Sequence, residues 1–338
     1  MFTAEYKGIN SFLVGASSLL LKYGVKRKTR GHNCVELPEP FMFKITDPTA
    51  RIVTISQRKW NPILPFAESL WLASGRNDLE FIGHYLKNMK NFSDDGLFLR
   101  GGYGPRLRKY NNEILDYKSN SIKIENQKNE IDQFDFVYKS FKRDINTRQG
   151  VITIGDPLKD CFDLSGNLKQ TKDFPCTRVL HFQKKANENK LNLTVYMRSN
   201  DLLWGASAVN IFNFTFIQEY FAKLLSLEVG DYYHIAGNFH YYEEYETIIK
   251  DISKVKEFQD KGFNYHKSFN NLIEFDNLIE KIGAIEKELR NGNKTIIDFQ
   301  DDFFNDWYKT FYVFNTHQKV NFTNPLLNNL FKKYMKYE

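Results

Sequence analysis

Apolar residues recur with two different periods along this chain, and the mixture restricts it to folds that combine strands with helices. Alternation at period two, which is typical of half-buried strands, occurs at 41–45, 51–55, 150–154 and 191–197. Helical spacing occurs at 62–74, 210–225 and 273–289, and again at the C-terminal end. Because no internal repeat and no linker rich in Gly, Pro or Ser interrupts this order, we expect one mixed α and β core.

The composition indicates a globular protein with a substantial core. The chain has 338 residues, of which 42% are hydrophobic and 26% are charged, enough for one large domain or two modest ones. Residues 110–130 are rich in Asn and Lys and lack periodicity, which predicts a surface loop or insertion. After residue 245 the composition shifts toward Lys, Glu, Asn, Phe and Ile, and we interpret this part as a helical extension.

The charge favours a small anionic ligand over a nucleic acid. The net charge is +6, but Lys and Arg are interspersed with Asp and Glu along most of the chain, and no basic tail stands out. A phosphorylated small molecule fits this pattern, whereas a nucleic-acid partner is not expected.

The cysteines and the start of the chain predict a cytoplasmic protein. Three cysteines without a CxxC spacing argue against a disulfide framework and against a structural zinc site, so we expect no metal. The beginning MFTAEYKGIN lacks the order of a signal peptide. The apolar run at 12–21 is shorter than the roughly 20 residues that span a bilayer, and we expect no membrane association.

Three short segments carry candidate chemistry. Cys176 lies in DFPCTRV before a strand-like run, and a cysteine near cations can be held as the reactive thiolate, although a lone cysteine is more often a small buried hydrophobe. The segment RSND places Arg198 and Asp201 between a strand and an apolar helix, where a surface ion pair is the alternative. His240 and Tyr242 lie two apart and would share one face of a strand, as a sugar site or as packed core residues.

Together these segments resemble the thymidylate synthase family, including its nucleotide hydroxymethylase branch. The resemblance covers roughly residues 24–245 and rests on the order of eight weak motifs. The motifs are TRG (Arg30), AESLW (Glu68, Trp71), GGYGPRLR (Tyr103), NTRQGV (Arg148), PC (Cys176), RSND (Arg198, Ser199, Asp201), Asn210, and HYY (His240, Tyr242). It implies an α+β fold with a mixed sheet flanked by helices. We therefore expect a thymidylate-synthase-like catalytic core at 1–245 and a helical C-terminal extension at 246–338, packed on that core.

The resemblance also implies a role for each matched residue. Cys176 would add to C6 of a pyrimidine nucleoside monophosphate, and its 5′-phosphate would be held by Arg30, Arg148, Arg198 and Ser199. Arg148 would reach the site of the partner subunit, which implies a homodimer. Asn210 would contact the base, and His240 with Tyr242 the sugar. Asp201 would bind the pterin of 5,10-methylenetetrahydrofolate, near Trp71 and Phe92, and Glu68 with Tyr103 would serve proton transfer.

Some positions depart from the synthases proper. Thr177 follows the cysteine, Met197 precedes the phosphate arginine, and Phe92 lies in a stretch without the expected tryptophans. The segment from Gly205 to Asn210 holds one residue more than the usual spacing. These changes surround the base and the folate. We therefore expect water rather than hydride to react with the methylene intermediate, which gives a hydroxymethyl product.

Several alternatives stay open at this stage. Asn210 offers both a donor and an acceptor, which favours dUMP over dCMP. Methylation of dUMP with release of dihydrofolate is the alternative reaction. A non-catalytic nucleotide-binding subunit is the alternative of another class, although such a protein would not need the thiol of Cys176.

Overall fold

The computed structural model describes residues 1–29, 31–120 and 129–334. The chain divides into two compact units, which are described separately below. Unit 1 comprises 1–65, 176–222 and 227–264, and unit 2 comprises 66–175, 223–226 and 265–338.

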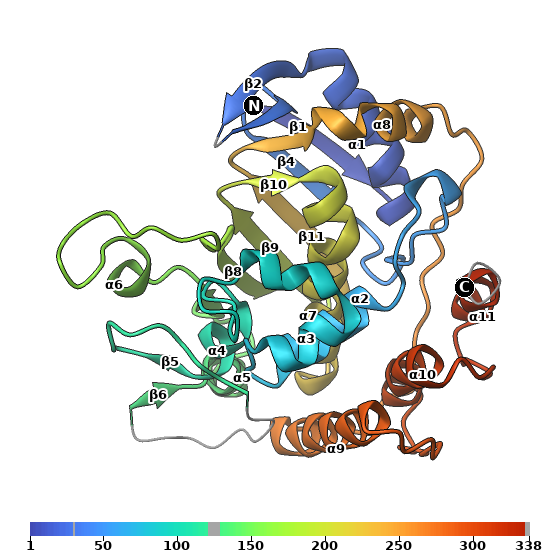
Figure 1. Cartoon of the computed structure of the whole chain (residues 1–338). Helices are drawn as coiled ribbons and strands as arrows, with labels where there is room; N and C mark the ends of the chain where they lie inside the picture. The colour runs from blue at the N-terminus through green and yellow to red at the C-terminus, as the bar shows by residue number, and fades with distance from the viewer. Residues whose placement is uncertain (30, 121–128, 335–338) are drawn as a thin grey trace. The chain divides into compact units, whose positions relative to one another are not determined.

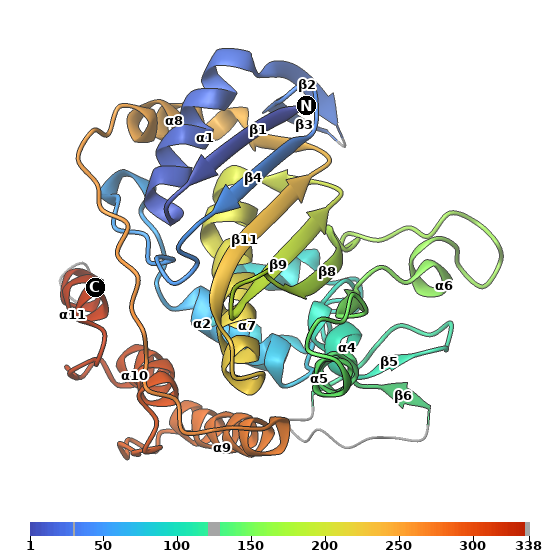
Figure 2. The same ribbon diagram turned by 180° about the vertical axis from the view of Figure 1, so that it is seen from behind.

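Unit 1 is built around a mixed sheet (Figures 1 and 2). Five of its strands follow one another in the order β1-β4-β11-β9-β8. Their bounds are β1 Phe2–Tyr6, β4 Phe41–Ile45, β8 Thr177–Lys184, β9 Lys190–Met197 and β11 Glu228–Ala236. β11 runs parallel to β9, whereas β8 runs antiparallel to β9, so the ends of β9 and β11 and the beginning of β8 lie at the same edge.

The two faces of this sheet differ in burial. On one face the paired positions are fully buried, among them Phe43 of β4, Tyr232 of β11 and Phe182 of β8. Phe12 of helix α1 (Ile9–Tyr23) packs on Phe43 with ring centroids 4.5 Å apart, and Phe221 of helix α7 (Ile211–Leu224) packs on Phe182 at 4.8 Å. The side chains of the other face are mostly half-buried, and Figure 2 shows β11, β9 and β8 without a helix in front of them.

A smaller sheet and several helices complete unit 1. The small sheet has the order β10-β12-β3-β2. Its strands are β2 Val25–Thr29, β3 His32–Glu36, β10 Asn200–Asp201 and β12 Phe239–Tyr242. The remaining helical elements are η1 Ser56–Arg58, η3 Leu202–Asn210, η4 Glu243–Tyr245 and α8 Glu246–Ser253. Helix α7 is buried on nearly all sides, and its buried polar side chains have partners, among them Glu219, which forms an ion pair with Arg51.

Unit 2 is mainly helical. Its helical elements are α2 Leu64–Ala73, which begins in unit 1, α3 Leu79–Tyr85, η2 Lys87–Phe92, α4 Tyr103–Arg108, α5 Gln133–Arg143, α6 Pro157–Asp160, α9 Leu272–Arg290, α10 Asp302–Thr316 and α11 Pro325–Tyr334. Its short strands are β5 Tyr110–Asn111, β6 Glu130–Ile131 and β7 Val151–Thr153. Side-chain caps begin several of these helices, since Asp78, Asp132, Asn271 and Asp301 each accept a backbone N–H of the first turn.

Arg108 joins three helices of unit 2. Its fully buried guanidinium donates to Asp132 at the start of α5 (2.7 Å) and to Asp276 of α9 (2.9 Å). A buried cation requires such partners. Trp307 of α10 in turn donates to the backbone carbonyl of Phe66 at 2.8 Å. The C-terminal helices α9 and α10 are therefore part of the packed core of unit 2, and the division of the chain at 245/246 into two domains stays a prediction.

Most predicted elements are found. The structure confirms the strands at 41–45, 150–154 and 191–197 and the helices at 62–74, 210–225 and 273–289 to within a few residues. The expected strand at 51–55 is wrong. There, the side chain of Asn10 donates to the carbonyl of Ile52 (3.1 Å) and accepts from the N–H of Thr54 (2.9 Å), so these groups bond to a side chain instead of a neighbouring strand.

The polar stretch at 110–130 is described in part, because 121–128 lie outside the described residues. Residues 112–120 have no regular structure, as predicted. However, Tyr117 and Ser119 are buried, so this segment is not confined to the surface. The side-chain amide of Asn77 donates to the carbonyl of Tyr117 at 2.8 Å. This bond fixes the segment to the loop that follows α2, within unit 2.

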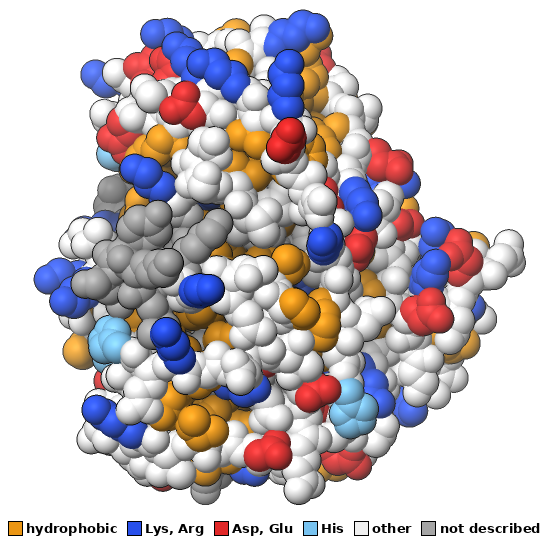
Figure 3. Space-filling model, turned by 90° about the vertical axis from the view of Figure 1, so that its right-hand side faces the viewer, with side chains coloured by type: hydrophobic (Ala, Val, Ile, Leu, Met, Phe, Trp, Pro, Cys, Tyr) orange, Lys and Arg blue, Asp and Glu red, His pale blue; other side chains and the backbone are white. Residues whose placement is uncertain are grey.

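Two surface properties bear on the choice of partner. No helix within the described ranges is long and apolar enough to cross a bilayer. Figure 3 shows one face on which Lys and Arg side chains are mixed with Asp and Glu, as the sequence predicts. This face therefore presents no continuous basic surface.

Candidate active site

The pairing of β8 with β9 brings the candidate nucleophile to a cation. Cys176 directly precedes β8 and Arg198 directly follows β9, and Thr177 pairs with Met197 in the antiparallel register. The N–H of Arg198 donates to the carbonyl of Cys176 at 2.9 Å, and the guanidinium Nη2 lies 3.5 Å from Sγ. The Cys176 thiol is partly exposed. Because a neighbouring guanidinium stabilises the anion, this arrangement favours the thiolate.

The sugar-site candidates lie at the same edge of unit 1. Gly237–Asn238 follows β11, which ends beside β9, and β12 begins at the next residue. His240 and Tyr242 lie on one face of β12, with ring centroids 5.3 Å apart and the planes at 85°. Ser199 Oγ donates to Asn238 Oδ1 at 3.4 Å, and His240 Nδ1 lies 2.8 Å from the same oxygen. Ser199 and His240 thus share one amide as their partner.

Asp201 is half-buried at the start of η3, and its Oδ2 atom is fully buried. The backbone N–H of Trp204 donates to Oδ1, as expected for a capping residue. Oδ2 is buried and has no hydrogen-bond partner among the described residues. Burial raises the pKa of Asp201 to about 6, although backbone N–H groups and the charge of Arg58 oppose this rise. A buried oxygen of this kind is suited to accept from the N–H groups of a ligand.

Element η3 contains the segment from Gly205 to Asn210, in which the sequence predicts one residue more than usual. It is a π-helix, in which the N–H of Ile211 bonds to the carbonyl of Ala206, five residues before it. A π-helix accommodates an inserted residue without ending the helix. Arg58 supports this segment by donating to the carbonyl of Leu203 (2.5 Å) and to Ser207 Oγ (3.0 Å). The π-helix is followed directly by α7, and the extra residue itself stays a prediction.

A buried relay orients Asn210. Its amide Nδ2 donates to Asn200 Oδ1 at 3.1 Å, and Asn200 Nδ2 lies 3.0 Å from His234 Nε2. Burial lowers the pKa of His234 to about 3, so this ring is neutral and its Nε2 accepts. The second ring nitrogen then donates to Tyr232 Oη at 2.8 Å. Gly205 is required here, because a Cβ at that position would lie 2.3 Å from Asn200 Oδ1.

Unit 2 carries Glu68, Trp71, Phe92 and Tyr103. Glu68 and Trp71 lie on α2, where Glu68 is half-buried and Trp71 is buried, with its indole N–H donating to the carbonyl of Asp78 at 3.1 Å. Tyr103 is the first residue of α4 and is half-buried. The next residue must be glycine, because a Cβ on Gly104 would lie 2.2 Å from the carbonyl of Arg76. Phe92 ends η2 and is 51% exposed.

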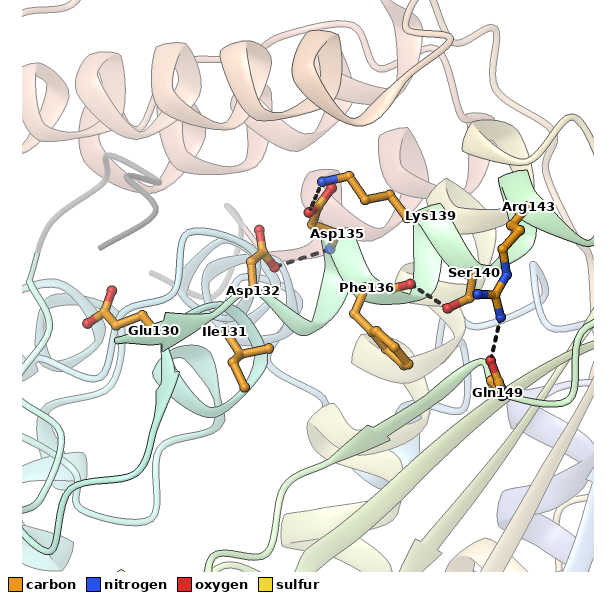
Figure 4. A pocket seen from close by; sticks show the side chains of 9 residues that line it. All are labelled: Glu130, Ile131, Asp132, Asp135, Phe136, Lys139, Ser140, Arg143 and Gln149. Carbon is orange, nitrogen blue, oxygen red and sulfur yellow. Dashed lines mark hydrogen bonds and ion pairs between the residues drawn. The ribbon is translucent and has the colours of Figure 1, made fainter. Parts of the chain in front are cut away.

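Arg148 lies in the loop between α5 and β7 and is exposed. This loop is braced by Arg143, which donates to the side chain of Gln149 at 3.0 Å. Both Arg143 and Gln149 line a shallow hollow of about 480 Å³ in unit 2 (Figure 4), to which none of the predicted site residues contributes. The hollow is lined by Glu130, Ile131, Asp132, Asp135, Phe136, Lys139, Ser140, Arg143 and Gln149. Its mixed charges do not indicate a ligand.

Arg30 lies outside the described residues, so its predicted phosphate contact stays a prediction. The nearby Arg27 donates to Glu36 Oε1 at 2.7 Å. Sequence reasoning missed Glu36, Arg58 and His234, all of which support predicted site residues. A buried histidine in a strand and a single arginine in an irregular segment carry no periodic or spacing signal. Their importance follows from contacts with residues far away in the chain.

The fold has counterparts among known proteins. A thermostable thymidylate synthase A from Bacillus subtilis matches with a TM-score of 0.58 and 18% identity, over 77% of this chain and 88% of that one, which confirms the predicted fold. The family model for thymidylate synthase matches residues 17–276. The chain therefore belongs to the thymidylate synthase family, as its motifs predict.

Two relatives show where in the family its similarity lies. A deoxyuridylate hydroxymethyltransferase of Bacillus phage SP01 is 40% identical over 240 residues, which are 70% of this chain and 58% of the relative. Thymidylate synthase 1 of Bacillus subtilis (strain 168) is 24% identical over 213 residues, which are 62% of this chain and 66% of the relative. The alignment thus spans less than two thirds of the length of each relative.

Proposed function

We propose that this protein transfers a one-carbon unit from 5,10-methylenetetrahydrofolate to C5 of a pyrimidine nucleoside monophosphate, and that the reaction is hydroxymethylation of dUMP. The observation that carries this proposal is the contact of the Cys176 thiol with the guanidinium of Arg198 at 3.5 Å, close along the chain to β10, where Asp201 pairs with His240. Greater identity to a deoxyuridylate hydroxymethyltransferase than to a thymidylate synthase supports the choice of product. Three free thiols agree with a place in the cytoplasm.

In this mechanism Cys176 adds to C6 of the base, which makes C5 nucleophilic. Arg198 and Ser199 bind the phosphate, with Arg30 and Arg148 as further cations, and Arg198 also stabilises the thiolate. C5 attacks the methylene carbon of the folate. The buried Oδ2 of Asp201 accepts hydrogen bonds from N–H groups of the pterin. Glu68 and Tyr103 serve the removal of the C5 proton, and Trp71 and Phe92 adjoin the folate. Loss of the C5 proton expels tetrahydrofolate and leaves an exocyclic methylene group, to which water adds; elimination of Cys176 from C6 then releases the hydroxymethylated nucleotide.

The orientation of Asn210 supports uracil as the base. One N–H of its amide is committed to Asn200, so its carbonyl is available as an acceptor. The other N–H of this amide is directed at Met197 Sδ, 3.6 Å away, so the carbonyl is the group that meets the base, and it complements the N3–H donor of uracil. Neutral cytosine presents an acceptor at N3 instead. We therefore place dUMP before dCMP.

The product distinguishes the reactions. With dUMP and methylenetetrahydrofolate, we expect release of the C5 proton and a product heavier than dUMP by CH₂O in the mass spectrum, without the absorbance rise of dihydrofolate. Parallel reactions with dCMP, UMP and CMP name the preferred base and sugar. Stoichiometric dihydrofolate would instead establish methylation. No proton release from any of the four nucleotides would establish a non-catalytic nucleotide-binding subunit.

We further propose a homodimer in which Arg148 serves the partner's site. Arg148 is exposed on a braced loop, and the half-buried sheet face with Tyr196 (42% exposed) and Ile235 offers a surface for a two-fold contact. We expect that mixing inactive Cys176→Ser chains with inactive Arg148→Ala chains restores part of the activity, because one heterodimer site then has both residues. Turnover after subunit exchange is the measurement.

The matched control for this experiment mixes Cys176→Ser chains with chains that carry both substitutions. No complete site can form in that mixture, and it should stay inactive. Exchange of subunits is verified with two distinguishable affinity tags. If exchange is complete and the first mixture is also inactive, Arg148 does not serve the partner's site.

A further inference from the structure

A relay of four side chains crosses the small sheet of unit 1 and ends at His240. Arg27 of β2 donates to Glu36 Oε1 at 2.7 Å, and Asn238 donates to Glu36 Oε2 at 2.7 Å. Asn238 Oδ1 lies 2.8 Å from His240 Nδ1. Glu36 and His240 are directly opposite residues of the antiparallel strands β3 and β12, so their side chains share one face.

The carboxylate of Glu36 determines the direction of the bonds on both of its sides in this relay. A carboxylate accepts only, so Asn238 must point its NH₂ group at Glu36 and its carbonyl at His240. The ring nitrogen Nδ1 must then carry the proton, which leaves the lone pair of the neutral ring on Nε2. Glu36 is 7% exposed, and its ionised form is supported by Arg27 on its other oxygen.

The residue types at positions 36 and 238 depend on each other, because one must be a carboxylate and the other an amide. Exchanging the two groups, with a carboxylate at position 238 and an amide at position 36, would satisfy the same atoms, because the carboxylate would accept from both His240 and the amide. A carboxylate at both positions would place two anions in contact. An amide at both positions would favour the reverse direction, because Arg27 would hold the oxygen of the amide at 36, whose NH₂ group would then face the oxygen of Asn238 and turn the NH₂ group of Asn238 toward His240.

We propose that Glu36 and Asn238 are positioning residues that hold His240 as the Nδ1–H tautomer, so that Nε2 accepts a hydrogen bond from a sugar hydroxyl of the nucleotide. This rests on the proposed function, which places His240 at the sugar. Neither residue touches the nucleotide in this scheme. Their effect is on nucleotide affinity and KM, whereas the chemical step at Cys176 is left to other groups.

The test exchanges the two groups singly and together. We expect Asn238→Asp and Glu36→Gln each to weaken dUMP binding by about tenfold or more, measured calorimetrically and as KM, with a smaller change in kcat. The double variant should recover binding to within about threefold of the parent protein. Glu243→Gln is the matched control, since Glu243 forms an ion pair with Lys26 of β2 (3.0 Å) outside the relay.

A second measurement separates this inference from the proposed function. The ¹⁵N shifts of His240, assigned by comparison with His240→Gln, report the tautomer in the protein without nucleotide. We expect the Nδ1–H form in the parent and in the double variant, and a shift toward the Nε2–H form in Glu36→Gln. If dUMP does not bind but the shifts follow this pattern, the relay stands and the proposed ligand is wrong. Additive losses in the double variant, or an Nε2–H tautomer in the parent, would overturn the relay.

Discussion

Cys176→Ser is expected to lower turnover by at least about 10⁴-fold while it leaves dUMP binding nearly unchanged. A neutral hydroxyl is a far poorer nucleophile than a thiolate. The guanidinium of Arg198 can favour ionisation of a thiol, but it cannot convert the much less acidic serine hydroxyl into an alkoxide. The hydroxyl is similar in size, so the phosphate and sugar contacts should persist. The measurement combines C5 proton release with calorimetric titration of dUMP.

Cys161→Ser is the matched control, because Cys161 is an exposed free thiol in a different unit and in no matching motif. It should retain parental activity. Full activity of Cys176→Ser would refute the thiolate mechanism as a whole. Loss of both turnover and binding would mean that Cys176 contributes to the structure of the phosphate site.

Asp201→Asn is expected to lower kcat/KM by about 10²–10³-fold and at the same time to stabilise the protein above pH 6. The value of kcat/KM falls because an amide cannot replace the charged oxygen that accepts hydrogen bonds from the N–H groups of the pterin. The stabilisation follows from burial, which raises the pKa of Asp201 from 3.8 to about 6. The shift corresponds to at most about 3 kcal/mol.

The direction of the pH effect follows from proton binding. Between pH 4 and about 6 the folded state holds a proton on Asp201 that the unfolded state has released, so the free energy of unfolding falls as pH rises through this range. Above about pH 6 the full cost of the buried anion is present. The Asn variant lacks this cost, so its melting temperature should exceed that of the parent by several degrees at pH 8 and match it near pH 4.

Asp251→Asn serves as the control, since Asp251 is an exposed carboxylate on α8. It should change neither the melting temperature nor the activity. A less stable Asp201→Asn protein at pH 8 would show that the capping bond to Trp204 outweighs the cost of burying the charge. Undiminished activity would remove Asp201 from the folate site.

Local patterns in the sequence predict most of the secondary structure and the family. Period-two alternation at 41–45 and 191–197 and the helical spacing at 273–289 record which side chains face the core, and a local pattern is sufficient for that. The motifs around Cys176 and Arg198 could likewise be recognised in the sequence, because each is a contiguous segment. The motif spacing predicts an extra residue before Asn210, but it does not predict that residues 202–210 form a π-helix.

Which distant residues are hydrogen-bond partners follows only from the three-dimensional packing of the chain. Asn10 replaces a strand partner for 51–55, Arg108 joins α4 to Asp276 of α9, and Glu36 sets the direction of the relay to His240. Buried polar groups must find partners, yet nothing in a local pattern says which residue far along the chain supplies them. The register of β12 on β3 brings Glu36 opposite His240, although the two residues lie far apart in the sequence. Long-range pairing of this kind is fixed by packing of the whole unit.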